Sequence, residues 1–374
     1  MKIGILTLTL HTNYGGILQA YALQTVLERM GHEVVVFNRP FTPSKTKWRQ
    51  IPKKIIKKLL GRDEVIFSER RYNREAAILN QHVWDFRKKY IHERIINSLY
   101  DIKEDDYECI VVGSDQVWRP RFFKSQWGTG VEDAFLAFTK GWNIKRIAYA
   151  ASFGVDTWEY TEEETRKCKE AIKMFDFISV REGSGIKLLK DYLGVNSAIQ
   201  VLDPTLLQNK EDYISLFEKA QTPPSGGNLL IYMLDVNNEK RNLISKIAEE
   251  RSLKPFTINK RLIKQTSPVE DRILPSFETW LRGFYDAELI VTDSFHACVF
   301  SIIFGKPFIT LGNEKRGMSR FQSLFSMFSL DYHLLEKANQ YSQEKLCTID
   351  DSIANRLQDI RMDSITHLSE ALSR

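Results

Sequence analysis

Four cysteines are too few and too widely spaced to define a disulfide framework or a zinc site. Cys109, Cys168, Cys298 and Cys347 form no CxxC pair, and both kinds of site normally show a recognisable cysteine spacing. No cluster of Asp, Glu, His or Cys at ligand spacing replaces them, so we expect no metal and no resident cofactor. These absences are typical of a protein that works in a reducing cytoplasm.

Long hydrophobic runs and a strong charge of one sign are also missing. No apolar stretch approaches bilayer length, and the amino terminus shows no signal-peptide pattern. The formal net charge of +5 is spread over 374 residues, which does not favour nucleic acid as a partner. With 43% hydrophobic residues, the chain has enough apolar material for a large core and two domains.

A βαβ pattern opens the chain. An apolar strand over residues 2–10 leads into a polar turn over 11–16, and apolar residues at helical spacing follow over 17–30. The turn contains Gly15 and Gly16, which would let a ligand approach the backbone. The pair forms neither GxGxxG nor a phosphate-binding GxxxxGK[ST] loop. A tight strand–helix junction needs glycine equally, so both uses remain open.

A second strand–turn–helix pattern contains the most informative histidine. The strand over residues 289–292 runs into Asp293 and Ser294, either of which could cap the next helix. His296 lies in the first turn of that otherwise apolar helix. A helix start at a sheet edge suits an anion, and an imidazole beside it can move a proton near neutral pH. We therefore predict that His296 is catalytic; the alternative is a satisfied, partly buried histidine.

Several other short apolar strands also end in polar loops. Near-continuous apolar strands indicate parallel sheets covered on both faces, and ligands of such sheets lie beyond the carboxyl ends of the strands. The side chains expected to converge there with Asn13 are Asp115, Gln116, Ser152, Arg181 and Asp203.

The predicted fold class is α/β, with two Rossmann-like lobes whose parallel sheets face a cleft. The first lobe covers residues 1–220 and forms the acceptor-binding side. A Pro- and Gly-containing linker separates it from the second lobe, residues 228–335, which carries the His296 helix start. Residues 336–374 are expected to form a helical tail that packs back on the first lobe.

Residues 51–60 read as a short basic amphipathic helix. Isoleucines and leucines share one face, and four lysines take the other. One interpretation is a solvated surface helix packed on the core. The other is shallow docking on an anionic bilayer at the inner face of the membrane, which would bring an enzyme to a lipid-linked substrate.

Six short motifs occur in a characteristic order: NYGGILQAYAL (13–23), GSDQVW (113–118), ASFG (151–154), SVRE (179–182), DPT (203–205) and TDSFHA (292–297). Together they resemble the polysaccharide pyruvyl transferase family, over most of the chain up to about residue 330. The resemblance implies a GT-B-like fold and transfer of pyruvate from phosphoenolpyruvate onto two sugar hydroxyls. The product would be a cyclic ketal in a cell-surface polysaccharide precursor, as in exopolysaccharide or capsule biosynthesis.

The chain departs from the family pattern at the start of the second-lobe helix. Better-known members look like Arg-Leu-His there, whereas Ser294 stands where the arginine is expected. Serine brings no charge and cannot replace a bidentate guanidinium. Arg181 looks like the second family arginine and would be the main anchor. Lys315, Arg316 and Arg320 are candidate substitutes for the missing charge, unless this basic loop is a solvated surface run.

Phosphoenolpyruvate needs two cationic or N–H-rich pockets, one for phosphate and one for carboxylate. Arg181 and the His296 helix start would supply them, with His296 as general acid–base. Asp115 is the candidate base for the sugar hydroxyl, or else a turn residue after a strand. Gln116 and Asn13 would orient the sugar. The further substrate-binding candidates are Tyr14, Gly15, Ser152, Ser294, Lys315 and Arg316.

Two alternatives from other classes stay open. A GT-B-type glycosyltransferase would use a nucleotide-sugar and bind UDP or GDP at the strand ends of the second lobe. A non-catalytic glycan-binding protein of the same fold would explain the loss of the family arginine at Ser294.

Overall fold

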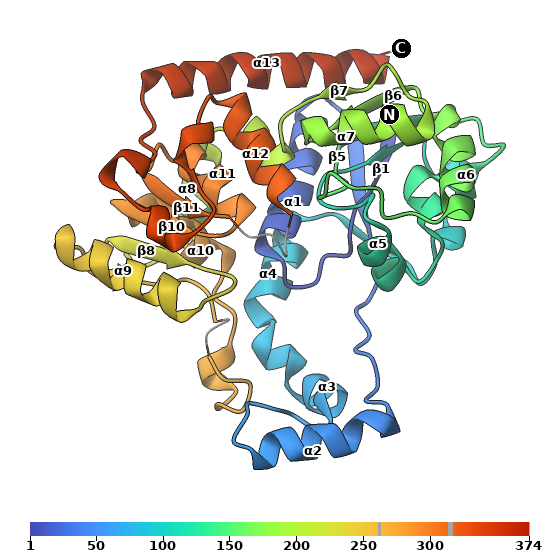
Figure 1. Cartoon of the computed structure of the whole chain (residues 1–374). Helices are drawn as coiled ribbons and strands as arrows, with labels where there is room; N and C mark the ends of the chain where they lie inside the picture. Colours follow the sequence, from blue (N-terminus) through green and yellow to red (C-terminus); the bar gives the residue numbers. More distant parts are fainter. Residues whose placement is uncertain (261–262, 313–316, 374) are drawn as a thin grey trace.

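The computed structural model describes residues 1–260, 263–312 and 317–373. Within these residues the chain forms two parallel β-sheets in separate lobes, each flanked by helices (Figure 1). The predicted α/β class, with two Rossmann-like lobes built on parallel sheets, is confirmed.

The first sheet has seven strands and the second has five. In spatial order the first sheet contains β3 (Glu93–Ile95), β2 (Glu33–Asn38), β1 (Lys2–Leu6), β4 (Cys109–Val112), β5 (Lys145–Ala151), β6 (Phe177–Val180) and β7 (Ile199–Gln200). The second contains β12 (Leu334–Leu335), β11 (Phe308–Leu311), β10 (Leu289–Thr292), β8 (Leu229–Tyr232) and β9 (Pro255–Phe256).

Helices connect these strands and cover the sheets. In chain order they are α1 (Tyr14–Arg29), α2 (Ile51–Leu59), α3 (Ser68–Leu79), α4 (Gln81–Tyr90), α5 (Pro120–Trp127), α6 (Glu162–Ala171), α7 (Gly183–Leu188), α8 (Lys210–Lys219), α9 (Asn238–Glu250), α10 (Phe277–Asp286), α11 (Phe295–Ile303), α12 (Met318–Met327) and α13 (Asp351–Ser373).

Helix α1 begins three residues earlier than its apolar spacing predicts. Strand β1 ends at Leu6, and Asn13 takes an extended backbone at the N-cap of α1. Gly15 and Gly16 therefore lie inside the first helical turn and not in the loop before it. Glycine weakens a helix interior, so these two positions need a tertiary reason.

One apolar cluster runs through both lobes. It includes Leu18 and Leu23 of α1, Leu206 in the segment after β7, and Trp280 and Phe300 of the second lobe, all nearly inaccessible to solvent. Buried side chains in continuous contact behave as one packed core. The two lobes are thus held against each other beside the cleft that separates their sheet edges.

Helix α13 crosses over both lobes at the top of Figure 1. Arg361 donates from Nε to the Leu206 carbonyl at 2.7 Å, and the Ser364 hydroxyl accepts from the Leu202 amide at 3.1 Å. Leu368 is fully buried on the same side of the helix. The tail is therefore bound to the segment that leads from β7 toward the second lobe.

Helix α2 lies far from both sheets, at the bottom of Figure 1. None of its nine residues is buried, so the interpretation that it packs its apolar face on the core is wrong. The physical reason is that Lys54 and Lys57 bind residues 64–66, while Ile55, Ile56 and Leu59 remain exposed. No described helix is long and apolar enough to cross a membrane.

Truncating Leu368 tests whether α13 contributes to the core. Leu368→Ala should lower the free energy of unfolding by about 2–5 kcal/mol, because it leaves a cavity under the helix. Met362→Ala is the control on the same helix, since Met362 is 59% exposed; it should change stability by less than about 0.5 kcal/mol. Urea denaturation measures both. Equal effects would mean that α13 is not docked as described.

Candidate active site

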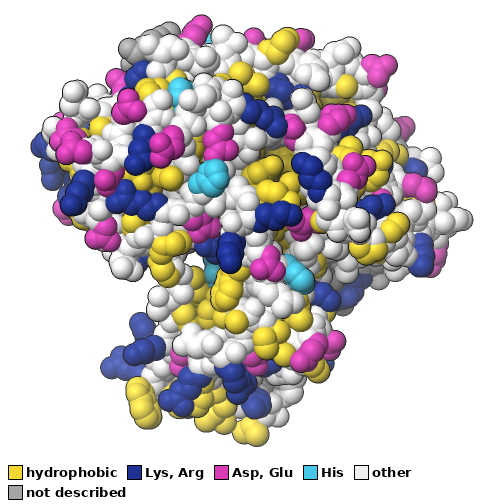
Figure 2. Space-filling view, turned by 180° about the vertical axis from the view of Figure 1, so that it is seen from behind, with side chains coloured by type: hydrophobic (Ala, Val, Ile, Leu, Met, Phe, Trp, Pro, Cys, Tyr) yellow, Lys and Arg dark blue, Asp and Glu magenta, His cyan; other side chains and the backbone are white. Residues whose placement is uncertain are grey.

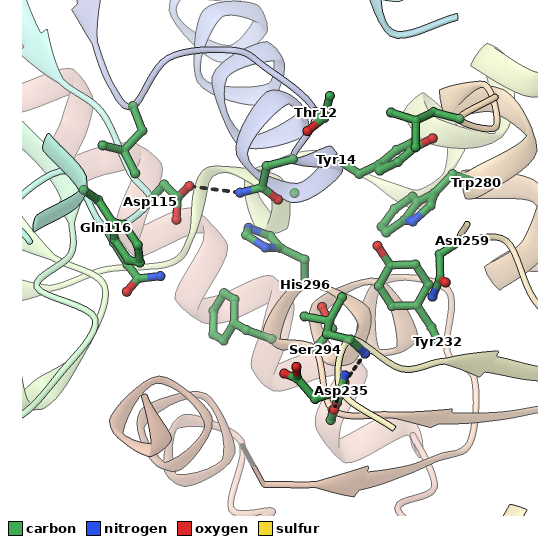
Figure 3. A pocket seen from close by; sticks show the side chains of 18 of the residues that line it. Thr12, Tyr14, Asp115, Gln116, Tyr232, Asp235, Asn259, Trp280, Ser294 and His296 are labelled. Atoms are coloured by element: carbon green, nitrogen blue, oxygen red, sulfur yellow. Dashed lines mark hydrogen bonds between the residues drawn. The ribbon is translucent and has the colours of Figure 1, made fainter. Parts of the chain in front are cut away.

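A cleft of about 770 Å³ lies where the carboxyl ends of the two sheets face each other. Its first-lobe wall includes Asn13, Asp115 and Gln116, and its second-lobe wall includes Ser294 and His296. Figure 3 shows Asp115 and Gln116 of the first lobe and Ser294 and His296 of the second around one space. The structure thus brings together most of the residues that the sequence nominates.

His296 lies at the meeting point of the two lobes. It belongs to the first turn of α11, and its ring is in contact with the start of α1. A Cβ atom added to Gly15 would lie 2.1 Å from His296 Nδ1, closer than real atoms approach. Gly15 is therefore required because the imidazole needs the space; contact of Gly15 with a ligand stays a prediction.

Asp203 joins His296 to Arg181. Its Oδ2 atom lies 2.5 Å from Arg181 Nη1 and 3.9 Å from His296 Nε2, and it also accepts from the Ser114 hydroxyl at 3.3 Å. All of these groups are buried. A buried charge is tolerated only when it is paired and hydrogen-bonded. The three residues therefore act as one charged unit behind the cleft wall.

The protonation of this unit follows from burial and from charge. Burial lowers the pKa of His296 to about 4, although Asp203 opposes the shift. Burial pushes the pKa of Asp203 upward, but the nearby Arg181 and His296 outweigh it and the pKa is lowered. Burial likewise acts to lower the pKa of Arg181, but the charges of Asp203 and Glu182 outweigh it and the pKa is raised. At neutral pH the site holds a carboxylate, a guanidinium and a neutral imidazole.

Arg181 pairs with Asp203 behind the cleft wall and does not line the cleft itself. It is 4% exposed, it does not line the cleft, and its guanidinium carbon lies 4.6 Å from the centre of the Phe295 ring. This placement corrects the expectation that Arg181 and His296 share a solvent-accessible crevice. Two polar atoms of the unit, Arg181 Nη2 and His296 Nε2, are buried without a hydrogen-bond partner among the described residues. Direct contact of Arg181 with a substrate stays a prediction.

Arg320 is a described residue of the basic segment that lines the cleft. It lies in α12, lines the cleft, and has its guanidinium carbon 5.5 Å from the Phe295 ring centre. Burial, together with the charge of Arg181, lowers the pKa of Arg320 to about 10, so it stays protonated at neutral pH. The other two candidates, Lys315 and Arg316, lie outside the described residues.

Asp115 stands in a left-handed backbone conformation with φ of 63°. Its Oδ2 atom accepts from Asn13 Nδ2 at 3.3 Å (Figure 3). Outliers of this kind cost free energy and gather at functional sites, although Asp tolerates the region better than most residues. Gln116 is held beside it, because its Oε1 atom accepts from Arg119 Nη1 at 3.0 Å. Asp115 and Gln116 both line the cleft; their expected roles toward a sugar hydroxyl stay predictions.

The second-lobe helix start differs from the predicted capping. Ser294 is the N-cap of α11, but its side chain makes no capping hydrogen bond and it lines the cleft. The Asp293 carboxylate instead accepts from the amides of Leu234 at 2.6 Å and Asp235 at 3.1 Å, and it pairs with Lys240 at 2.7 Å. The prediction that one of these two side chains caps the helix is therefore wrong. The Asp293 carboxylate accepts instead from the backbone amides that follow β8.

Of the two candidates Ser152 and Tyr14, only Tyr14 lines the cleft. Ser152 is fully buried, does not line the cleft, and donates to Glu182 at 2.5 Å. Its placement is that of a residue that positions Glu182, so substrate contact by Ser152 stays untested. Tyr14 lines the cleft and donates to the Pro275 carbonyl, and burial raises the pKa of its hydroxyl.

Sequence reasoning missed several cleft residues. They come from loops and helices without a recognisable motif, and no local pattern would have selected them. Four are cations, which gives the described cleft wall more positive than negative side chains: Arg119, Arg121, Lys260 and Arg272. Such a wall favours an anionic ligand. Within the described ranges, no group of three His, Cys, Asp or Glu side chains could hold a metal ion.

Comparison with protein families identifies one relationship over most of the chain. A family model described as "Polysaccharide pyruvyl transferase" matches residues 13–315. A search of curated proteins finds no match.

Solved structures of low identity match nearly the full length of the chain. UDP-GlcNAc 2-epimerase from Neisseria meningitidis, bound to UDP-GlcNAc, is 11% identical, with 98% of this chain and 100% of that chain covered and a TM-score of 0.46. Sucrose-phosphate synthase from Thermosynechococcus elongatus is 11% identical, with 99% and 98% covered and a TM-score of 0.47. UDP-GlcNAc 2-epimerase from Methanocaldococcus jannaschii is 13% identical, with 97% and 99% covered and a TM-score of 0.44.

The buried neutral imidazole predicts acid sensitivity. In the unfolded chain His296 takes up a proton below its usual pKa of 6.5, whereas in the folded chain it stays neutral down to about pH 4. Stability should therefore fall as the pH drops through this window, by about 2 kcal/mol between about pH 7.5 and pH 5. His296→Asn should remove that part of the pH dependence. Urea denaturation at both pH values measures it, and identical pH dependence in the two proteins would contradict a buried neutral His296.

Proposed function

Because this chain belongs to the polysaccharide pyruvyl transferase family, we propose that it moves pyruvate from phosphoenolpyruvate onto two hydroxyls of a sugar. The sugar would be part of a cell-surface polysaccharide precursor, and the product a cyclic ketal. The observation that supports this most is the position of His296. It lies on the cleft wall between the lobes, against Gly15 and beside the Asp203–Arg181 pair.

The reaction needs proton transfer at two places. A proton is added to the methylene carbon of phosphoenolpyruvate, which makes the central carbon electrophilic. One sugar hydroxyl then bonds to that carbon, and phosphate leaves with the electron pair of its C–O bond. The second hydroxyl closes the ring. The two hydroxyl protons balance the one taken up by carbon and the one carried away on phosphate.

His296 is the residue that we assign to these transfers. Its pKa of about 4 makes it a neutral proton acceptor in the free protein. A bound phosphate and carboxylate would favour the imidazolium by their charge, so substrate binding itself would raise this pKa. The same residue then serves as base toward a hydroxyl and as acid toward carbon. Asp115, with Asn13 and Gln116 beside it, is proposed to receive the acceptor sugar.

Arg320 is proposed to supply the charge that Ser294 lacks. It lines the cleft near the start of α11, where the N-cap residue Ser294 also lines the cleft. Its pKa is lowered to about 10 because its charge is buried and close to that of Arg181. An anion in contact with it would relieve this cost. Arg181 does not line the cleft, so it would act on a bound substrate indirectly, through its ion pair with Asp203.

Replacing His296 tests the assignment directly. In an assay with phosphoenolpyruvate and candidate glycans, phosphate release and the ketal methyl signal in NMR spectra report the reaction. His296→Ala should lower kcat by roughly 10²–10⁴-fold, the usual contribution of a general acid–base. His367→Ala, in an exposed part of α13, is the control and should behave as wild type. Unchanged ketal formation by His296→Ala would refute its role.

The same assay separates the alternatives. Release of UDP or GDP from a nucleotide-sugar, with no ketal, would identify a glycosyltransferase. Glycan binding without any turnover would identify a binding protein of this fold.

Replacing Arg320 tests the anchor. Arg320→Met should raise the KM for phosphoenolpyruvate by roughly 10–100-fold, since a charge-assisted hydrogen bond is worth about 1.5–3 kcal/mol, and Arg320→Lys should be intermediate. Arg166→Met, at an exposed position of α6, is the matched control. An unchanged KM for phosphoenolpyruvate in Arg320→Met would exclude Arg320 as the anchor.

A further inference from the structure

Helix α2 and the short turn before it, Trp48–Gln50, present large apolar side chains to solvent. Trp48 is 87% exposed, Leu59 81% and Leu60 70%, and Ile55 and Ile56 are exposed beside them. We call these five residues the apolar face of α2. Figure 2 shows hydrophobic and basic side chains gathered at the lower end of the molecule, where α2 lies in Figure 1.

The orientation of α2 is the reverse of that of an ordinary surface helix, which turns its apolar stripe toward the core. Lys54 donates from Nζ to the carbonyls of Val65 and Ile66, each at 3.2 Å. Lys54 and Lys57 also lie 3.8 Å and 3.5 Å from Glu64 carboxylate oxygens. These contacts keep one edge of the lysine face against the protein. The apolar face consequently points outward.

The charge of the chain is concentrated around this helix. Residues 45–62 contain eight lysines and arginines and no Asp or Glu. The charge of +8 on this segment exceeds the net charge of +5 for the whole chain, so the remaining residues together are net negative. A second copy of the chain would bring the same eight cations against these, which disfavours self-association through this surface. An anionic partner with an apolar layer beneath its charges is the complement.

We propose that the apolar face of α2 docks on an anionic lipid bilayer. Leucine and isoleucine side chains would enter the acyl boundary, Trp48 would lie at the headgroup level, and the flanking lysines would meet the lipid phosphates. The helix has only nine residues, so binding is reversible and depends on both apolar burial and charge.

The bilayer-docking surface is connected to the cleft. Asp63, three residues after Leu60, accepts from the amides of Gln265 at 2.6 Å and Thr266 at 2.9 Å. Gln265 itself lines the cleft, as does Arg272, which pairs with Glu75 of α3. Docking would therefore hold the cleft near the membrane surface. If the proposed transfer is correct, an acceptor sugar carried on a lipid is the class of substrate that benefits.

Vesicle sedimentation with the full-length chain tests the docking. We expect binding to vesicles of phosphatidylcholine with about one third phosphatidylglycerol, and much weaker binding to phosphatidylcholine alone. Binding should weaken in about 1 M salt, where the Debye length is about 3 Å. No binding to the anionic vesicles, or equal binding to both kinds, would overturn the proposal.

Two pairs of substitutions separate the apolar and the charged contributions. Ile56→Ser with Leu59→Ser should weaken binding at least about tenfold, and Lys53→Gln with Lys58→Gln should weaken it roughly 30-fold. The matched controls are Ile95→Ser with Met362→Ser and Lys140→Gln with Lys219→Gln, at exposed positions elsewhere. They should bind as wild type. Equal loss in test and control pairs would contradict docking through α2.

Two further measurements distinguish bilayer docking from dimerisation through the same face and from the proposed pyruvyl transfer. Sedimentation velocity would reveal a dimer; a dimer that is lost in the Ile56→Ser with Leu59→Ser protein would assign the face to a second copy and overturn bilayer docking. Ketal formation on a water-soluble acceptor should be unchanged in that protein. A chain that binds vesicles but never consumes phosphoenolpyruvate would refute only the proposed reaction.

Discussion

The Asp203 carboxylate is the interaction on which the centre of this molecule depends. It follows β7 in the first lobe, is neutralised by Arg181 after β6, and lies 3.9 Å from the His296 ring of the second lobe. Removing Arg181 would leave a buried charge uncompensated, which is among the most costly changes that a protein interior can undergo. The same carboxylate therefore stabilises the sheet edge and sets the electrostatic surroundings of the candidate catalytic histidine.

Close packing between the lobes places this chemistry in a defined space. The absent Cβ of Gly15 lets the start of α1 contact the His296 ring, and the apolar cluster that continues from α1 to α11 keeps the two helices in position. Arg320 and the other basic residues of the wall then make the cleft attractive to an anion. An anion bound there would favour the imidazolium form of His296.

Helix α2 shows the opposite physical situation, because large apolar side chains, including Ile56 and Leu59, are exposed to solvent. Lys54 and Lys57 bind residues 64–66, so the apolar face of α2 stays available to another surface. The molecule thus separates two kinds of environment in space. A buried, charged cluster lies beside the cleft, and an apolar and basic helix is exposed at the far end.

Local patterns were sufficient for the two parallel sheets, the family and the position of His296 in the first turn of a helix, since apolar strands, turn residues and helix starts are encoded by neighbouring residues. They failed where contacts join distant segments. The start of α1 at Tyr14, the burial of Arg181 behind Phe295, the Ser152–Glu182 bond and the arrival of Arg320 at the cleft each depend on packing between separate elements. The α2 pattern correctly predicted two faces, but which face turns inward was settled by Lys54 and Glu64, because periodicity carries no information about what lies on either side of a helix.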